Sequence, residues 1–238
     1  MTSDKCYDNT HNECLHTEND PMGGFDPYSA SKGAAELVTS SYRNSFFNSK
    51  NSTQIATARA GNVIGGGDWA KDRLIPDSIR ALMKNQSVKI RNPNAKRPWQ
   101  YILESISGVL WLAAKMYEED KFNEAWNFGP DKNYDSLRVE DIVKRTMKNW
   151  SSKGAIEIQN NSDMLHESKY LLLDSSKANQ RLGWKNIFPI DQALSETIEW
   201  YKTYHENNKD MKQFTMDQIK NYTSLAQENN LIWAKQEN

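Results

Sequence analysis

Apolar residues recur at helical spacing along several long segments of the chain. In residues 28–48 they stand three or four positions apart, which predicts an amphipathic helix with apolar positions at Ala34, Leu37, Val38, Tyr42 and Phe46. The same spacing predicts a helix over 104–118, with Ile106, Val109, Leu110, Ala113 and Met116 on one face. Further helices are predicted near 77–85, 138–150, 175–182 and 191–205. A last helix is predicted to open at a capping box over residues 215–218 and to run to about residue 228.

Short runs typical of β-strands lie between these helices. Residues 55–64 form one such run, and shorter ones are predicted at 125–128, 155–158 and 170–173. The stretch that follows residues 1–7 and runs to Pro27 is polar and rich in Asn, Asp, Gly and Pro, so it is expected to form a long loop. Because strands and helices alternate, the pattern predicts an α/β architecture.

Composition narrows the class of protein. The 238 residues can form one large domain or two modest ones, and 11% aromatic residues argue against disorder. Thirty Lys and Arg nearly balance 31 Asp and Glu, giving a net charge of -1. Nucleic acids and anionic membranes select a basic excess, so neither is an expected partner. No transmembrane or signal segment is recognisable, which predicts a cytoplasmic protein. Cys6 and Cys14 lack metal-ligand spacing, and no metal site is expected.

Tyr28 and Lys32 stand four positions apart at the start of the first predicted helix. Residues at this spacing share one helix face, so the phenol and the ammonium can point into one site. An unperturbed tyrosine has a pKa of roughly 10, and a nearby cation lowers that pKa by favouring the phenolate. Such a group can take the proton of a hydroxyl while hydride leaves the same carbon. Taken alone, the spacing also fits a solvated helix face.

A hydroxyl, a carboxyl and an amine occupy consecutive positions at Ser3, Asp4 and Lys5, with Asp4 standing 24 residues before Tyr28. This arrangement resembles the extended short-chain dehydrogenase/reductases, and within them the sugar-nucleotide 4,6-dehydratases. The resemblance covers essentially the whole chain, in family order. It rests on residues 2–7, 19–24, 28–33, 59–69, 73–77, 97–101, 126–130 and 182–184.

The resemblance implies a partial Rossmann-type, doubly wound parallel sheet with a smaller mixed α/β substrate-binding domain. Residues 1–134 would be a remnant of the NAD-binding domain, with a substrate loop at about 62–76. Residues 135–238 would form a C-terminal sugar-nucleotide-binding domain and a helical tail. The family's Gly-x-x-Gly-x-x-Gly turn does not occur in this sequence. We therefore expect this chain to act only when complemented by a missing N-terminal half that holds the cofactor NAD.

Catalytic roles follow from the same resemblance. Tyr28 would deprotonate the substrate's C4 hydroxyl while hydride passes to NAD⁺, and Lys32 would lower the tyrosine pKa and hold the nicotinamide ribose. Asp4 would protonate the C6 oxygen as water leaves, and Ser3 would polarise O4. Both Tyr28 and Lys32 would thus also contact the cofactor.

Lys5 distinguishes branches of the family. The dTDP-glucose branch carries glutamate as the C5 base at this position, whereas the CDP-glucose branch carries lysine. A lysine can act as a base only when neutral, which requires burial or a neighbouring cation. Otherwise it stays charged and stabilises the enolate electrostatically. The sequence leaves both roles open.

Substrate contacts are implied at Asn62, near the diphosphate, and at Arg73 and Arg97, which would grip the phosphates. Glu167 stands where the family often keeps an acid for the nucleotide ribose. Each arginine can also be a surface salt bridge. The glycines at 65–67 precede no Lys-Ser/Thr pair, so they are interpreted as part of a substrate-domain loop and not as a phosphate loop.

The expected partner is CDP-glucose or a similar sugar nucleotide. Two alternatives remain: another sugar-nucleotide dehydratase or epimerase, or a non-catalytic sugar-nucleotide-binding fragment or subunit. The resemblance also implies a homodimer formed through the helix at 28–48.

Overall fold

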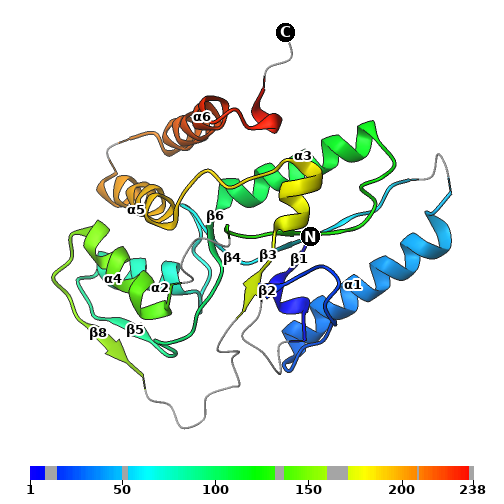
Figure 1. The fold of residues 1–238 in the computed structure, drawn as a ribbon. Helices are drawn as coiled ribbons and strands as arrows, with labels where there is room; N and C mark the ends of the chain where they lie inside the picture. The colour runs from blue at the N-terminus through cyan, green and yellow to red at the C-terminus, as the bar shows by residue number, and fades with distance from the viewer. Residues whose placement is uncertain (9–14, 50–52, 132–136, 160–170, 208, 236–238) are drawn as a thin grey trace.

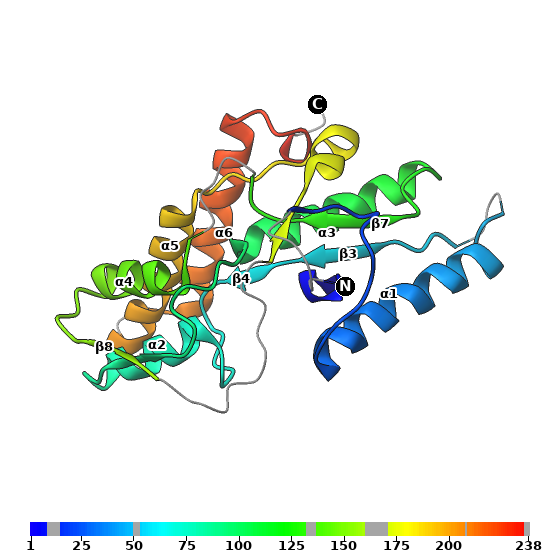
Figure 2. The same cartoon turned by 60° about the horizontal axis from the view of Figure 1, so that its bottom comes forward.

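The computed structural model describes residues 1–8, 15–49, 53–131, 137–159, 171–207 and 209–235. At its centre is a three-stranded parallel sheet in the order β1 (Thr2–Ser3), β3 (Thr57–Ala60) and β7 (Ala125–Phe128). Helix α1 (Pro27–Phe46) lies on one side of this sheet and α3 (Ile102–Glu118) on the other (Figures 1 and 2). The expected α/β class with parallel strands is therefore confirmed.

The remaining strands form three parallel pairs: β2 (Leu15–His16) with β9 (Leu172–Leu173), β4 (Asn62–Ile64) with β6 (Trp99–Tyr101), and β5 (Val88–Ile90) with β8 (Ile156–Ile158). The other α-helices are α2 (Leu74–Met83), α4 (Val139–Trp150), α5 (Ile190–Glu206) and α6 (Met211–Glu228). Three shorter helices complete the description: η1 (Asp4–Cys6), η2 (Ala178–Leu182) and η3 (Ile232–Ala234).

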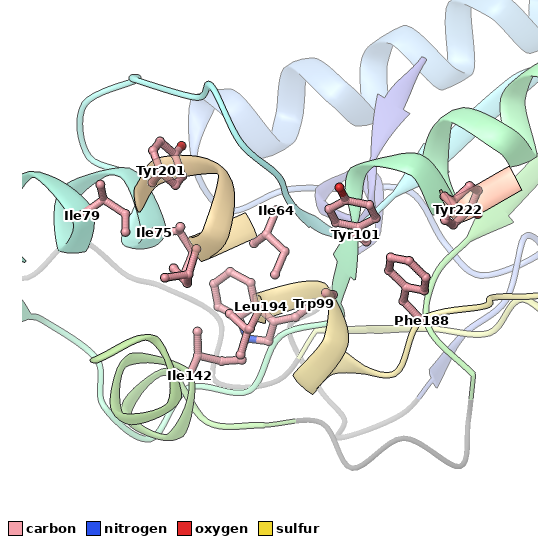
Figure 3. Packing of buried hydrophobic residues seen from close by; sticks show 12 residues of the cluster. Ile64, Ile75, Ile79, Trp99, Tyr101, Ile142, Phe188, Leu194, Tyr201 and Tyr222 are labelled. Atoms are coloured by element: carbon pink, nitrogen blue, oxygen red, sulfur yellow. The ribbon is translucent and has the colours of Figure 1, made fainter. Parts of the chain in front are cut away.

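Two buried apolar clusters hold these elements together. One lies between α3, the central sheet and η2, and includes Leu112, Trp126 and Trp184. The other, drawn in Figure 3, joins β4, α2 and β6 to α4, α5 and α6; its members include Ile64, Ile79, Trp99, Ile142, Leu194 and Tyr222. This second cluster takes side chains from both sides of residue 134. The domain division there stays a prediction.

The prediction of one strand over residues 55–64 is wrong. The chain forms β3, passes through Gly61, and then forms β4 in a different sheet. A Cβ atom on Gly61 would stand 2.4 Å from Cγ of Pro98, so the close approach of Pro98 requires glycine here. Residues typical of β-strands stand on both sides of Gly61, which is why the pattern predicted a single strand.

The predicted capping box at residues 215–218 is also wrong. Helix α6 begins one turn earlier, because Asp210 Oδ1 accepts hydrogen bonds from the amides of Lys212 at 2.9 Å and Gln213 at 3.4 Å. Thr215 lies inside the helix and donates to the carbonyl of Met211 at 2.8 Å. The long loop expected after residue 7 is likewise interrupted, by β2. None of the helices in the described ranges is long and apolar enough to cross a membrane.

A buried acid, Glu104, ties three distant parts of the chain together. Its Oε1 accepts hydrogen bonds from the amides of Ile187 at 2.9 Å and Phe188 at 2.8 Å, and its Oε2 accepts one from the Tyr222 hydroxyl at 2.9 Å. The side chain is fully buried. Burial raises the pKa of Glu104 from 4.5 to about 7, although these hydrogen bonds act in the opposite direction.

Stability is expected to fall as the pH rises from about 5 to about 8. Because the folded state raises the pKa of Glu104, it favours the protonated acid. The contribution of this group to the free energy of unfolding is therefore fully present below pH 4.5 and is lost as the pH rises through about 7. A shift of this size corresponds to about 3 kcal/mol. We expect Glu104→Gln to flatten the dependence, as measured by urea unfolding at several pH values. If the unfolding free energy of Glu104→Gln fell with pH as steeply as that of the wild type, other titrating groups would be the cause.

Candidate active site

The carboxyl end of β1 leads directly into η1, where three predicted site residues form one cluster. Ser3 caps η1 by accepting a hydrogen bond from the Lys5 amide at 3.3 Å, and its hydroxyl donates to Asp4 Oδ1 at 2.7 Å. The Lys5 ammonium nitrogen lies 3.4 Å from the same Asp4 oxygen. A hydroxyl, a carboxyl and an amine are thus gathered within hydrogen-bonding reach of one another.

Asp4 has an unused acceptor. The residue is fully buried, and its Oδ2 atom has no hydrogen-bond partner among the described groups. A buried polar oxygen without a partner costs free energy, so this atom calls for a proton or a bound ligand. Lys5 differs, because about a third of its side chain, 34%, is exposed.

Tyr28 and Lys32 lie in the first two turns of α1. The helix is capped by Asp26, whose carboxylate accepts from the Ser29 amide at 3.0 Å and the Ser29 hydroxyl at 2.6 Å. Pro27 occupies the first turn, where its missing N–H costs nothing. The ammonium nitrogen of Lys32 lies 5.3 Å from the centre of the Tyr28 ring, and that ring is half exposed. The phenol is therefore accessible to a ligand, with a cation beside it.

Gly33 brings α1 against the loop that carries Asp4 and Lys5. A Cβ atom at this position would stand 2.8 Å from the carbonyl oxygen of Gly23 and 3.2 Å from that of Cys6. Those two residues are themselves joined, because the Gly23 amide donates to the Cys6 carbonyl at 2.9 Å. The helix of Tyr28 and Lys32 consequently packs directly on η1.

Beside this contact lies a buried polar network, none of whose residues was predicted as a site residue. Glu36 of α1 accepts hydrogen bonds from Arg59 Nη2 at 2.8 Å, from the Thr57 hydroxyl at 2.7 Å and from the Thr2 hydroxyl. Burial alone would raise the pKa of Glu36, but these hydrogen bonds and the Arg59 charge lower it overall. The sequence signal for this network was a charged residue, Arg59, within an otherwise largely apolar strand segment.

Tyr7 continues the network toward β7. Arg59 Nη1 donates to the Tyr7 hydroxyl at 2.7 Å, and that hydroxyl donates to Asn127 Oδ1 at 2.6 Å. The Asn127 side-chain nitrogen donates to the carbonyl of His16 at 2.9 Å and that of Asp174 at 3.3 Å. The network therefore joins α1, β3, the η1 loop and β7.

A cavity of about 220 Å³ contains one of the two predicted phosphate-binding arginines. Arg97 lines it and is almost fully buried, as is the neighbouring Gln100. The Gln100 side chain donates to the carbonyl of Phe128 at 2.8 Å, while its Oε1 has no described hydrogen-bond partner. The other lining residues are Leu15, Pro98, Trp99, Pro130, Asp131, Leu137, Leu172, Leu173, Asn186, Phe188, Ile190 and Ala193. The buried cation suits an anionic group of a ligand, and the partnerless Gln100 oxygen suits a hydrogen-bond donor on it.

Asn62 links this cavity to the acid–base cluster. It lies opposite Trp99 in the β4–β6 pair, two positions after Ala60, and Ala60 lies opposite Ser3 in the β1–β3 pair. Its side-chain Oδ1 is buried and has no described hydrogen-bond partner. The two ends of the candidate site are therefore joined through two paired strands and Gly61.

Arg73 lies elsewhere. It precedes α2, its side chain is 65% exposed, and it pairs with Asp68 Oδ2 at 3.2 Å. It is not among the residues that line the cavity, so the cavity does not bring the two arginines together. Glu167 falls outside the described residues. In the same described ranges, no group of three or more His, Cys, Asp or Glu side chains could hold a metal ion.

The glycine run at 65–67 packs against α5. A Cβ atom on Gly66 would stand 2.1 Å from Cγ of Trp200, and the Tyr201 hydroxyl donates to the carbonyl of Asp68 at 2.6 Å. These contacts explain the glycine at position 66 by close helix packing.

Comparison with known proteins gives consistent matches. A family model described as GDP-mannose 4,6 dehydratase matches residues 1–197. The chain is 48% identical over 231 residues to CDP-glucose 4,6-dehydratase from Salmonella typhimurium, covering 95% of this chain and 64% of that protein. It is 24% identical over 193 residues to mouse (Mus musculus) dTDP-D-glucose 4,6-dehydratase, covering 81% of this chain and 52% of that protein. The chain thus spans less than two thirds of the length of these relatives.

Solved structures share the fold. A dTDP-glucose 4,6-dehydratase from Bacillus anthracis, crystallised with NAD, superposes with a TM-score of 0.71 at 18% identity, covering 90% of this chain and 63% of that one. DesIV, a dTDP-glucose 4,6-dehydratase from Streptomyces venezuelae with NAD and TYD bound, gives a TM-score of 0.69 at 18% identity, covering 84% and 58%. The expected Rossmann-type class is confirmed by these likenesses.

Proposed function

Since the chain belongs to the GDP-mannose 4,6 dehydratase family, we propose that it carries the acid–base residues of an NAD-dependent sugar-nucleotide 4,6-dehydratase acting on CDP-glucose. The observation that carries the proposal is the Ser3–Asp4–Lys5 cluster, packed through Gly33 against the helix of Tyr28 and Lys32. The 48% identity to the Salmonella enzyme supports CDP-glucose as the substrate.

In the proposed reaction, Tyr28 removes the proton of the C4 hydroxyl, and the Lys32 charge stabilises the phenolate. On substrate binding, the Ser3 hydroxyl turns its single proton from Asp4 Oδ1 to O4. Asp4 then gives its proton to the C6 oxygen, which leaves as water, and the acidified C5 proton passes to a water molecule beside the partly exposed Lys5. The partnerless, buried Oδ2 of Asp4 supports this assignment, because a substrate oxygen would complete its contacts.

We propose that Lys5 acts through its charge. A neutral lysine needs burial or a neighbouring cation, whereas the Lys5 side chain is a third exposed and its nitrogen lies 3.4 Å from Asp4 Oδ1. A cation in this place stabilises the negative charge that develops as the C5 proton leaves. This choice favours one of the two roles that the sequence left open.

The residues present fit one end of the cofactor. Bound NAD⁺ would supply the acceptor for the C4 hydride and return that hydride to C6. Tyr28 is half exposed with Lys32 beside it, so both can contact a ribose. A Gly-x-x-Gly-x-x-Gly turn for the pyrophosphate does not occur in the sequence. We therefore propose that groups from outside these 238 residues hold the pyrophosphate.

At the nucleotide end, we propose that Arg97 and Asn62 contact the diphosphate. Both carry a buried polar group next to or within the cavity, and Arg97 supplies the positive charge that phosphates require. Arg73 would reach the phosphates from outside the cavity. Glu167 stays a prediction for the ribose contact.

We also propose that two copies associate through α1. Besides the site residue Tyr28, four large apolar side chains of this helix are more than half exposed: Leu37, Val38, Tyr42 and Phe46. An exposed apolar helix face of this size is typical of a protein interface. Sedimentation at rising concentration is expected to show a dimer that Leu37→Glu weakens. A monomeric wild-type chain at high concentration would refute the association.

A turnover assay tests the proposed function. The purified chain is incubated with CDP-glucose and NAD⁺, and the alkali-induced absorbance of the 4-keto-6-deoxy product is followed. A parallel sample contains the portion of the Salmonella relative that this chain does not match. We expect turnover in the supplemented sample, and faster turnover of CDP-glucose than of dTDP- or UDP-glucose.

The other outcomes each identify an alternative. Preference for dTDP- or UDP-glucose would indicate another branch of the family. Calorimetric binding of CDP-glucose with no turnover in either sample, and no effect of NAD⁺ on binding, would indicate a non-catalytic sugar-nucleotide-binding module.

A further inference from the structure

Four nearly fully buried polar residues have no part in the proposed chemistry: Tyr7, Glu36, Arg59 and Asn127. Each comes from a different part of the fold. Glu36 lies on the helix that bears Tyr28, about two turns further along, and Tyr7 lies three residues after Asp4. The network therefore spans the same two elements that would have to cooperate in the reaction.

The donors and acceptors of this network have a fixed order: Arg59 donates to Tyr7, and Tyr7 donates to Asn127. Glu36 engages one side of the Arg59 guanidinium at 2.8 Å, leaving Nη1 to donate to the Tyr7 hydroxyl at 2.7 Å. Burial raises the pKa of the Tyr7 phenol, so the phenol stays neutral and its hydroxyl donates a hydrogen bond to Asn127 Oδ1 at 2.6 Å. An arginine cannot accept and a neutral phenol has one proton to donate, so no alternative arrangement satisfies the four groups equally.

Tyr7 is also fixed by its ring. The ring stacks on His16 with centroids 4.7 Å apart and planes within 5°, and the Arg59 guanidinium lies 5.0 Å from the ring centre. Two ring contacts and two hydrogen bonds hold the end of the loop that begins at Ser3. A loop pinned at this end has little freedom to shift Asp4 or Lys5.

We propose that the Glu36–Arg59–Tyr7–Asn127 network is a positioning device. It fixes the position of Asp4 and Lys5 relative to Tyr28 and Lys32. The proposal rests on the proposed function, because the relative position of the two pairs of residues matters only if both pairs act on one substrate. Its residues act through the loop and do not touch the substrate.

The test uses Tyr7→Phe, which keeps the stacked ring and removes only the hydroxyl. Cys6, the adjacent buried thiol, reports on the loop independently of catalysis, in a Cys14→Ser background so that a single thiol is present. Cys6 is fully buried, and this burial raises the pKa of its thiol to about 12, so labelling by a disulfide reagent at pH 8 requires loop opening. We expect the labelling rate to rise about tenfold or more in Tyr7→Phe, because two buried hydrogen bonds are lost.

Catalysis is expected to change in kcat and not in substrate binding. A misplacement of about 1 Å costs on the order of a hundredfold in rate, so kcat for CDP-glucose in the supplemented assay should fall by about that factor. The calorimetric Kd for CDP-glucose should stay within about twofold, because Asn62 and Arg97 lie outside the network. Tyr117→Phe is the matched control, since Tyr117 is 94% exposed and should change none of the three quantities.

The outcomes separate this proposal from the proposed function. Absence of turnover in the unmodified chain speaks against the function, and the Cys6 labelling rate can still be read. Unchanged labelling in Tyr7→Phe, or faster labelling with an unchanged kcat, overturns the positioning role. If Tyr7→Phe does not fold by circular dichroism, Thr57→Val removes one hydrogen bond from Glu36 and is expected to give a smaller change in the same direction.

Discussion

Replacing Tyr28 by phenylalanine is expected to reduce turnover of CDP-glucose by at least about a thousandfold, within the range found for general acid–base groups. The ring, its exposure and the start of α1 would all remain, and only the hydroxyl beside Lys32 would be lost. The C4 proton would then have no acceptor. The measurement is the formation rate of the 4-keto-6-deoxy product in the supplemented assay, with CDP-glucose binding followed by calorimetry.

Tyr42→Phe provides the matched control. Tyr42 lies on the same helix and is 55% exposed, close to the 54% of Tyr28, so a loss caused by altered helix packing would affect both variants. We expect Tyr42→Phe to keep wild-type turnover. If Tyr28→Phe kept more than about a tenth of the wild-type rate, Tyr28 would not be the proton acceptor.

The largest effect on stability is expected from Arg59→Met. Glu36 and Arg59 are each about 4% exposed by side chain, and removal of the cation leaves the carboxylate buried without its charge partner. Breaking a buried pair in this way costs about 3–5 kcal/mol in the free energy of unfolding. Urea unfolding at pH 7 measures the loss.

Two further variants show whether the isolated charge is the cause. Glu36→Gln combined with Arg59→Met removes both charges and is expected to recover much of the stability, because no ion is left unpaired. Arg73→Met breaks an exposed pair with Asp68 and should change stability by no more than about 1 kcal/mol. A double variant as unstable as Arg59→Met alone would mean that lost packing, and not the charge, dominates.

The sequence predicted those parts of the fold that depend on local patterns. The helix at 28–48 and the strand at 125–128 are signalled by the spacing of their own residues, and the structure has them at Pro27–Phe46 and Ala125–Phe128. The break at Gly61 was missed because its cause is the approach of Pro98, 37 positions away in the chain. The start of helix α6 was predicted too late in the chain, because Asp210 and not Thr215 caps the helix.

The candidate site shows the same division. Tyr28 with Lys32, and Ser3 with its two neighbours, are short-range patterns that the sequence displays directly. The partnerless oxygen of Asp4 and the role of Tyr7 depend on contacts across the fold. Tyr7, for example, meets Asn127, 120 positions later. No local periodicity encodes a hydrogen bond of that separation, and a resemblance carries over only the residues whose roles are already recognised.

The packing of Gly61 fixes the separation between two parts of the proposed site. Ser3 lies opposite Ala60, Asn62 lies opposite Trp99, and the single residue between Ala60 and Asn62 is packed against Pro98. The separation between the proton-transferring groups and the proposed diphosphate contacts is therefore set by backbone geometry and cannot stretch. A substrate that engages both Ser3 and Asn62 must therefore match a separation that the paired strands hold fixed.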